Sequence, residues 1–485
     1  TVDLQRVAIS NAALYLKSDS SGVFNAGQLL ELDNSGKKVS AINLNWDGLL
    51  VDLTELDIQY HHALGSKRME ALVHRLAAKV DRPSSDSLWL NGNIDLYFRG
   101  IAFNTDVGAY LQETPVGGQL EISLSPTAWT LSPTLLAVGE QEFTTSATFS
   151  RLPGAASYIY LENERTDYEL SRRLLHDILQ ERLTKYAVSA PFPVTAKIIT
   201  TLEENDDPEI STTFTLNGQD VRLLQNKFKD VHLSGTFVNR LSPARGGILG
   251  SRKNLFFSLD SVSGYREDVY ITTPHAEIAV ANNNPKLTAP IRLSGSAPAI
   301  SKWLENDNFF FTDGRFSLDI GVNAYLDYYE ELVSATDGQL RLSNVDVFYK
   351  PASASFPFEE IKLSKRADDV GFDLKSKSLP TGFSFEMFGT IDNLAPLLIE
   401  QPTGQLRTDV TLLAPHINWT DFLAFFGQNG YLQIEENQME SDSLEDPGIT
   451  AMKTALVGIE ETFHPTIEAR FDSVGYYDVF TLTNF

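Results

Sequence analysis

The sequence predicts a mainly β protein, an elongated, repetitive and curved antiparallel sheet with a groove-like form, one amphipathic helix and few short helices. The first observation is the strict alternation of polar and apolar residues, clearest at 314–320, where Phe316, Leu318 and Ile320 share one face. Because successive side chains of a strand point to opposite faces, this segment predicts a strand with one apolar and one solvated face. The second observation is that the segment recurs, which favours a repetitive β array over a compact enzyme.

Four copies of the alternating segment begin with a glycine, at Gly118, Gly314, Gly338 and Gly404. Glycine adopts positive φ angles without the steric cost that other residues meet. Each copy is therefore predicted to start at a turn or a β-bulge.

A longer unit surrounds two of these copies. Segment 291–295 (Ile-Arg-Leu-Ser-Gly) is followed by a short apolar segment at 303–304, and segment 383–390 is followed by one at 397–398. An alternating copy comes next in both cases. Segment 231–235 (Val-His-Leu-Ser-Gly) is a degenerate third example. Repetition at this scale is typical of architectures that grow by adding similar units.

Residues 1–160 are predicted to form an N-terminal β-sheet segment. Alternation marks strands at 42–46 and 56–60, and Ser10 and Asn11 mark a turn between two short strands. Segment 69–80 has the composition of a helix, but its residues at even positions from 72 to 80 also fit one face of a strand. We expect a strand there.

Residues 161–190 are predicted to hold the amphipathic helix, at 166–186, and a linker. Thr166 is the expected N-cap, with Glu169 three residues later completing a capping box. The apolar stripe of the helix consists of Tyr168, Leu175, Ile178, Leu179 and Leu183. Such a helix either lies on a membrane or caps the end of a β structure, and we favour capping or covering an exposed sheet edge.

Residues 191–340 are predicted to be central β repeats and residues 341–485 C-terminal β repeats. We expect a loop at 306–313 that carries an apolar tip, Phe309 to Phe311. We also expect a short helix at 420–426 and an acidic surface loop at 435–446. Because the chain opens and ends within strands, it is expected to be part of a longer protein.

Composition excludes several classes of function. The chain has 485 residues and a net charge of −25, which disfavours nucleic acid as a partner and simple adhesion to anionic lipid headgroups. It has no cysteine, which excludes disulfides, cysteine-based metal sites and thiol nucleophiles. No apolar run approaches the ~18 residues of a transmembrane helix.

No motif in the sequence points to catalysis, and we expect neither an enzyme nor a cofactor. None of the eight histidines stands in a metal-ligand spacing, and there is no serine-hydrolase elbow or phosphate-binding loop. Two distant carboxylates could still build a glycosidase, and the sequence nominates no pair.

The excess of one-sided strands points instead to an apolar surface that needs a partner. Large contiguous apolar patches are uncommon on soluble monomers unless a ligand or another protein covers them. Acyl chains would fill such a surface, which makes phospholipid the expected ligand. Ordinary sheet core remains the alternative for each residue. The candidate lipid-binding residues are Phe316, Leu318, Ile320, Leu340, Leu342, Phe383 and Phe385.

These stretches resemble the AsmA-like family of Gram-negative envelope proteins. The resemblance rests on 291–304 with 314–320, on 383–398 with 404–410 and on 415–423, and the segments 340–349 and 4–15 match the family and each other. It implies a periplasmic protein held in the inner membrane by an N-terminal helix missing here, with envelope proteins as partners. It also implies a β-rich groove for phospholipid transport or outer-membrane integrity. The family has no catalytic motif to transfer.

Two other classes of function remain open. A structural or adhesive surface protein would fold its strands into β-sandwiches with filled cores. A carbohydrate-active enzyme would place two carboxylates across a cleft. A continuous open apolar face would favour lipid handling over both.

Overall fold

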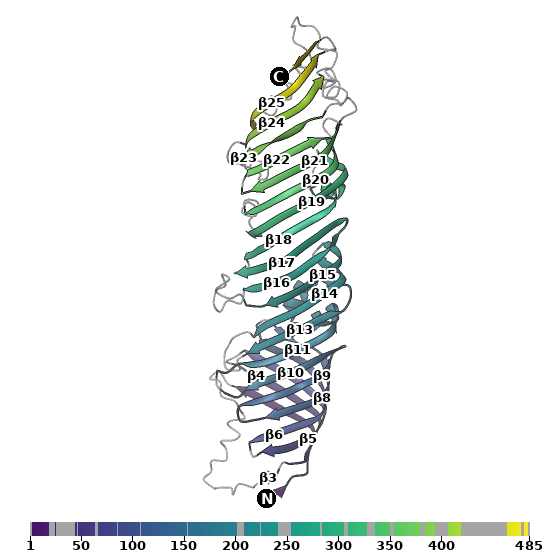
Figure 1. Ribbon diagram of the computed structural model, residues 1–485. Coiled ribbons are helices and arrows are strands. Elements are labelled where there is room, and N and C mark those ends of the chain that lie inside the picture. Colours follow the sequence, from purple (N-terminus) through teal and green to yellow (C-terminus); the bar gives the residue numbers. More distant parts are fainter. Residues whose placement is uncertain are drawn as a thin grey trace, which may run out of the picture. The chain divides into compact units, whose positions relative to one another are not determined.

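A computed structural model confirms the mainly β fold (Figure 1). Strands make up 80% of the residues that the structure describes, which fixes the fold class. The chain divides into two units: unit 1 is Thr1–Leu259 with Ala279–Asn283, and unit 2 is Asp260–Ile278 with Asn284–Phe485. The four-part organisation expected from the sequence stays a prediction. The described residues are 2–18, 25, 44–45, 47–63, 66–84, 86–106, 108–152, 154–200, 208–223, 225–240, 254–281, 284–304, 309–326, 335–349, 354–367, 369–378, 384–392, 406–418, 463–476 and 480–483.

Unit 1 contains two of the short helices. Its elements are β1 (Val2–Asp3), β2 (Arg6–Ser18), β3 (Leu44–Asn45), β4 (Leu49–His62), β5 (Lys67–Ser84), β6 (Ser87–Asn104), β7 (Gly108–Tyr110), β8 (Thr114–Leu124), β9 (Ala128–Val138), β10 (Gln141–Ser150), β11 (Ser157–Thr166), α2 (Tyr168–Arg173), α3 (Asp177–Leu183), β12 (Tyr186–Val188), β13 (Phe192–Thr200), β14 (Glu209–Leu223) and β15 (Asn226–Val238). Two further strands, β16 (Leu255–Arg266) and β17 (Val269–Ala281), contribute residues to both units.

Unit 2 contains the third described helix. Its elements are β18 (Asn284–Ser296), α4 (Ala297–Leu304), β19 (Phe309–Tyr325), β20 (Thr336–Tyr349), β21 (Ala354–Arg366), β22 (Asp369–Ser376), β23 (Glu386–Asp392), β24 (Leu406–Asn418), β25 (Phe463–Tyr476) and β26 (Phe480–Thr483).

The strands of each unit form an open, mainly antiparallel sheet, as predicted. Neighbours along the chain pair antiparallel, for example β4 with β5 and β5 with β6 in unit 1, and β18 through β24 in unit 2. Among the described pairings, three are parallel: β1 with β3, β2 with β4, and β24 with β25. The described part of β2 pairs with β4 alone, and that of β26 with β25 alone.

A line of bulges crosses neighbouring strands of unit 2. Gly314 in β19 has a φ of 98°, and Asn344 in the facing part of β20 has a φ of 52°. The register shifts again between Phe358 and Glu360, where β21 pairs with β22. A bulge bends its strand and increases the local twist, so the sheet curves along this line.

The glycine prediction is confirmed for two of the four copies. Gly314 lies at a bulge, and Gly118, with a φ of 155°, lies where the register of β8 and β9 shifts. Gly338 has no positive φ and instead lies beneath the Ile320 side chain, so that part of the prediction is wrong. Gly404 lies outside the described residues.

Tertiary pairing decides three segments that sequence patterns left open or misassigned. Segment 69–80 is a strand, as expected, because it pairs along its length with β4. The turn predicted at Ser10 and Asn11 is wrong: β2 runs through both, and Asn11 adopts a positive φ of 50° within the strand. The loop predicted at 306–313 is wrong from Phe309 onward, because β19 starts there and pairs with β20.

The predicted helix at 166–186 is wrong in its start and in its continuity. β11 continues to Thr166, and Asp167 is the N-cap, whose carboxylate accepts a hydrogen bond from the Leu170 amide at 3.0 Å. α2 then ends at Arg173, with Leu174 as its C-cap. His176 has an extended backbone and a buried side chain (5% exposed), so a tertiary contact interrupts the helix before α3 begins.

Other predictions lie outside the described residues. These are the apolar segment at 397–398, the helix at 420–426, the acidic loop at 435–446 and the candidate residue Phe383.

Candidate functional site: an apolar face on each sheet

Apolar side chains form rows that cross the strands of unit 2. The first row follows register partners over seven successive strands, from β18 to β24. Because each residue lies directly opposite the next, the side chains stand side by side on one face of the sheet. The first row consists of Leu293, Leu318, Leu340, Leu363, Phe372, Gly389 and Val410.

A second row lies two residues along on the same seven strands. Side chains two residues apart on a strand share a face, so both rows belong to one surface, the apolar face of unit 2. The second row consists of Gly295, Phe316, Leu342, Ile361, Leu374, Met387 and Leu412.

Five of the seven candidate lipid-binding residues lie in β19 and β20 on this side of the sheet. Leu318 and Leu340 are direct cross-strand partners in the first row, and Phe316 and Leu342 are partners in the second. Ile320 belongs to a third row, beside Gly338, which the charged Lys365 interrupts after one more strand.

Burial separates these residues into two groups. Phe316 (3% exposed) and Leu342 (2% exposed) are core residues, whereas Leu318 and Leu340 are half-buried and pack against that core. Phe385 lies just before β23 and also packs against it. The alternative of ordinary sheet core is therefore correct for Phe316 and Leu342.

The cover over this core is α4, which the sequence analysis missed. Ala297, Ala299 and Ile300 of α4 are buried in one cluster with Phe316 and Leu342. The spacing of Ala297 and Ile300 is that of a helix face, which is the signal that could have revealed the helix. The small alanine side chains bring the helix backbone close to the sheet.

Past the cluster beneath α4, the apolar face is only partly covered within the described residues. Side chains of both rows remain half-buried there, neither enclosed in a core nor fully solvated. They are Phe372, Met387, Val410 and Leu412.

The repeated Leu-Ser-Gly unit has a structural role on these faces. Gly235 lies opposite Phe214, Gly295 opposite Phe316, and Gly389 of the longer copy opposite Phe372. A Cβ at each glycine would lie within 3.2 Å of the facing aromatic ring. At Gly235 the ring is the nearest group and excludes a larger residue. At Gly295 and Gly389 a backbone carbonyl oxygen lies closer still, that of Asp268 and that of Asp409, and the ring adds to the exclusion.

Unit 1 carries a longer row of the same kind. It follows register partners over nine strands, from β4 to β14, and most of its side chains are half-buried. None of its members was among the sequence candidates, which all came from segments 316–320, 340–342 and 383–385. The row consists of Leu49, Val80, Leu90, Ile122, Leu131, Ala147, Ile159, Ile198 and Ile210.

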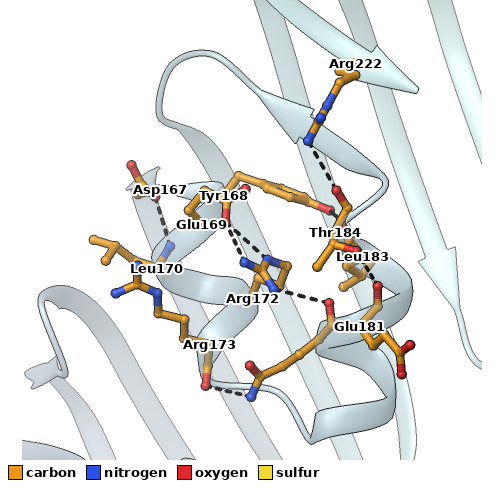
Figure 2. Close-up of polar contacts among 11 residues, drawn as sticks. Asp167, Tyr168, Glu169, Leu170, Arg172, Arg173, Glu181, Leu183, Thr184 and Arg222 are labelled. Carbon is orange, nitrogen blue, oxygen red and sulfur yellow. Dashed lines mark hydrogen bonds and ion pairs between the residues drawn. The ribbon is translucent and has the colours of Figure 1, made fainter. Parts of the chain in front are cut away.

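The helices of unit 1 also contact an apolar cluster. Tyr168 of α2 packs against a cluster that includes Phe192, Leu216 and Val221. The expected role of covering a sheet edge stays a prediction. The Tyr168 hydroxyl donates a hydrogen bond to the Leu183 carbonyl at 2.9 Å and so ties α2 to α3 (Figure 2). Burial, with a smaller contribution from the Glu169 charge, raises the pKa of Tyr168 to about 12.

The opposite face of unit 2 is polar and carries ion pairs. Arg292 pairs with Asp319 at 2.5 Å, and Lys362 with Glu360 at 2.6 Å. These side chains are exposed by a third or more. Exposed pairs contribute about 0–1 kcal/mol each, so their main effect is to keep this face solvated.

A polar hollow of about 260 Å³ lies on the polar side of unit 1. Arg68 and Arg99 line it, but each arginine is paired, Arg68 with Glu70 at 2.6 Å and Arg99 with Asp57 at 2.9 Å. The hollow therefore offers little unpaired charge for a ligand. Among the described residues, no group of three or more His, Cys, Asp or Glu side chains could hold a metal ion.

Comparisons with known proteins leave the family open. No family model, no curated protein and no solved structure matches the chain. No described helix has the length and apolar character needed to cross a membrane.

Proposed function

We propose that this chain handles phospholipid without enzymatic chemistry, and that acyl chains lie along the apolar faces of its sheets. The setting we propose is the periplasm of a Gram-negative envelope, with the full-length protein held in the inner membrane and acting with envelope proteins. The process would be lipid transport or outer-membrane integrity. This follows the resemblance to the AsmA-like family in the repeated segments.

The observation that carries the proposal is the continuity of half-buried apolar rows from strand to strand. With strands about 4.8 Å apart, the seven-strand rows of unit 2 extend about 29 Å. One leaflet of a bilayer accounts for about half of the ~30 Å hydrocarbon core, so a full acyl chain fits along a row. Each CH₂ group removed from water contributes about 0.8 kcal/mol.

The rival functions receive less support. A sandwich would need a second sheet against the apolar face, whereas the described strands of each unit join into an open sheet. Ordinary core explains Phe316 and Leu342 beneath α4, but it leaves the half-buried Phe372 and Val410 without a cover among the described residues. A groove binds lipid equally in both directions, so a gradient or a partner must supply direction.

The test is mass spectrometry of lipids that co-purify with the protein and with two matched variants. Phe372→Asn/Val410→Asn changes two members of the first row that lie outside the cluster beneath α4. Phe388→Asn/Thr411→Asn changes cross-strand partners of β23 and β24 on the opposite face of the same sheet. Circular dichroism checks that both variants fold.

We expect phospholipid on the parent and on the Phe388/Thr411 control, and its loss from the Phe372/Val410 variant. The apolar row would then be the binding surface. A well-folded parent without lipid would refute lipid handling by this chain. Equal lipid on all three proteins would refute the assignment to the apolar face.

A further inference from the structure

The apolar face of unit 1 runs out to solvent where β12 pairs with the end of β14. Val188 and Val221 are register partners there, and both belong to the cluster that Tyr168 contacts. Tyr186 and Leu223 are the partners two residues along, on the same face. They are 36% and 43% exposed, so the apolar surface continues without interruption from a buried cluster to the solvent.

Three exposed cations lie next to these two side chains along the chain. Lys185 precedes Tyr186, Arg222 precedes Leu223, and Lys227 of β15 lies directly opposite Arg222. Because neighbouring side chains of a strand point to opposite faces, Arg222 and Lys227 lie on the other face from Leu223, so the strand ends carry the apolar pair on one face and cations on the other. Like charges directly opposite one another destabilise a sheet, so sheet stability does not explain the Arg222–Lys227 pair. An anion bound there would remove the repulsion. We name the five residues Lys185, Tyr186, Arg222, Leu223 and Lys227 the rim patch.

The rim patch is held in place by α3. The Arg222 guanidinium donates a hydrogen bond to the Thr184 carbonyl at 3.2 Å, at the end of the helix (Figure 2). The adjacent Leu183 carbonyl accepts from the Tyr168 hydroxyl. Lys185 and Tyr186 follow this anchored helix end directly, so their backbone loses little conformational entropy on binding.

We propose that the rim patch docks on the surface of an anionic phospholipid bilayer, and that lipid passes there between the bilayer and the apolar face of unit 1. The second half of this statement rests on the proposed function. Tyrosine is enriched at membrane interfaces, and an exposed leucine beside it adds apolar area that inserts among acyl chains. An acidic protein partner would use the three cations but not the adjoining apolar pair.

The net charge of −25 does not prevent this docking. Charges more than about 8 Å away are largely screened at physiological ionic strength, so the local cations determine the attraction. Glu181, Asp220 and Asp230 are the nearest acidic residues along the same segments, and all three are exposed. The expectation from composition, that the chain avoids anionic headgroups, therefore applies to the chain as a whole and not to this patch.

The experiment measures co-sedimentation with vesicles of phosphatidylcholine, with and without phosphatidylglycerol. Lys185→Glu/Lys227→Glu reverses two patch charges and leaves Arg222 in place. Lys17→Glu/Arg75→Glu makes the same change of net charge at two exposed residues of β2 and β5. We expect the parent and the Lys17/Arg75 control to bind phosphatidylglycerol vesicles, and the Lys185/Lys227 variant to bind at least about tenfold more weakly.

A second measurement reports insertion directly. The chain has no cysteine, so Leu223→Cys gives a single site for an environment-sensitive fluorophore. We expect its emission to shift to the blue with phosphatidylglycerol vesicles and to stay unchanged with phosphatidylcholine alone. Ser364→Cys, at an exposed position on the polar side of β21, is the control and should not respond.

Three results would overturn the docking proposal: equal binding to both vesicle types, equal binding by the two charge-reversed variants, or an unresponsive fluorophore at position 223. Self-association that is lost in the Lys185/Lys227 variant would also overturn it and assign the patch to a second copy. Lipid bound to the apolar face without vesicle binding contradicts docking alone. Vesicle binding by a protein whose apolar face carries no lipid contradicts the proposed function.

Discussion

The pairing of glycine with a phenylalanine ring gives the sharpest test of how the repeat works. Gly235 and Phe214 are register partners, and a Cβ on Gly235 would lie 2.3 Å from the Phe214 Cζ atom. Non-bonded carbons are best placed about 3.5–4.0 Å apart, so Gly235→Ala forces the ring to move by more than about 1 Å. The ring is half-buried among neighbours in the cluster that Tyr168 contacts, which resists that movement.

The expected cost follows from two opposing effects. Forcing an extra methyl group into a packed site costs about 1–3 kcal/mol. Alanine recovers about 0.4–1 kcal/mol by restricting the unfolded chain, because Gly235 has no positive φ. We expect Gly235→Ala to destabilise the β14–β15 region by about 1–2 kcal/mol. In a Phe214→Leu background the ring is gone, so the same change should cost almost nothing.

Hydrogen exchange read by mass spectrometry is the appropriate assay. Long repetitive arrays do not unfold in one step, so a local opening free energy is more meaningful than a global one. Peptides covering 209–223 and 226–238 report on the pair. Gly321→Ala is the control, because a Cβ there meets nothing within 4 Å. Additive effects of the two substitutions, within about 0.3–0.5 kcal/mol, would refute the ring-over-glycine explanation.

Three further predictions test the bulge, a buried tyrosine and α4. Gly314→Ala places an alanine at a φ of 98° and puts its Cβ 2.7 Å from the Asn344 carbonyl oxygen. We expect the free energy of unfolding to fall by about 2 kcal/mol or more, and the melting temperature to fall with it. An unchanged melting temperature would contradict this. The raised pKa of Tyr168 means that the folded chain keeps a proton the unfolded chain has lost between pH 10 and about 12. The free energy of unfolding, measured with urea, should fall as the pH rises across that window, and it should fall less steeply in Tyr168→Phe. Equal pH dependence in the two proteins would refute the assignment of this effect to Tyr168. Ile300→Asp buries an unpaired charge beneath α4, so amides of 297–304 should exchange much faster, with no change expected in unit 1.

Local patterns predicted the faces of single strands correctly. Phe316, Leu318 and Ile320 share a face, and Leu318 faces Leu340 across β19 and β20, because both facts depend on the period-two alternation of a strand. The apolar rows of unit 2 extend this pattern over strands whose alternation is visible in the sequence. The candidate residues of β19 and β20 therefore share one face, and their lipid-binding role stays a prediction.

Burial on that surface could not be predicted from alternation. Phe316 and Leu318 look alike in sequence, yet Phe316 is enclosed beneath α4 whereas Leu318 is only half-buried. The difference arises because α4, which precedes β19 in the chain, folds back over part of the sheet. The rim patch was invisible for a similar reason, because Lys185 and Lys227 come together only when β12 and β15 both pair with β14.

The sequence by itself determined that this protein is mainly β, repetitive and one-sided, because side-chain alternation and glycine placement act within a few residues. Only the tertiary structure decided which strands pair in parallel, where His176 breaks the helix and which apolar residues are left half-buried. Those outcomes depend on contacts between segments far apart in the chain, and no local preference encodes them.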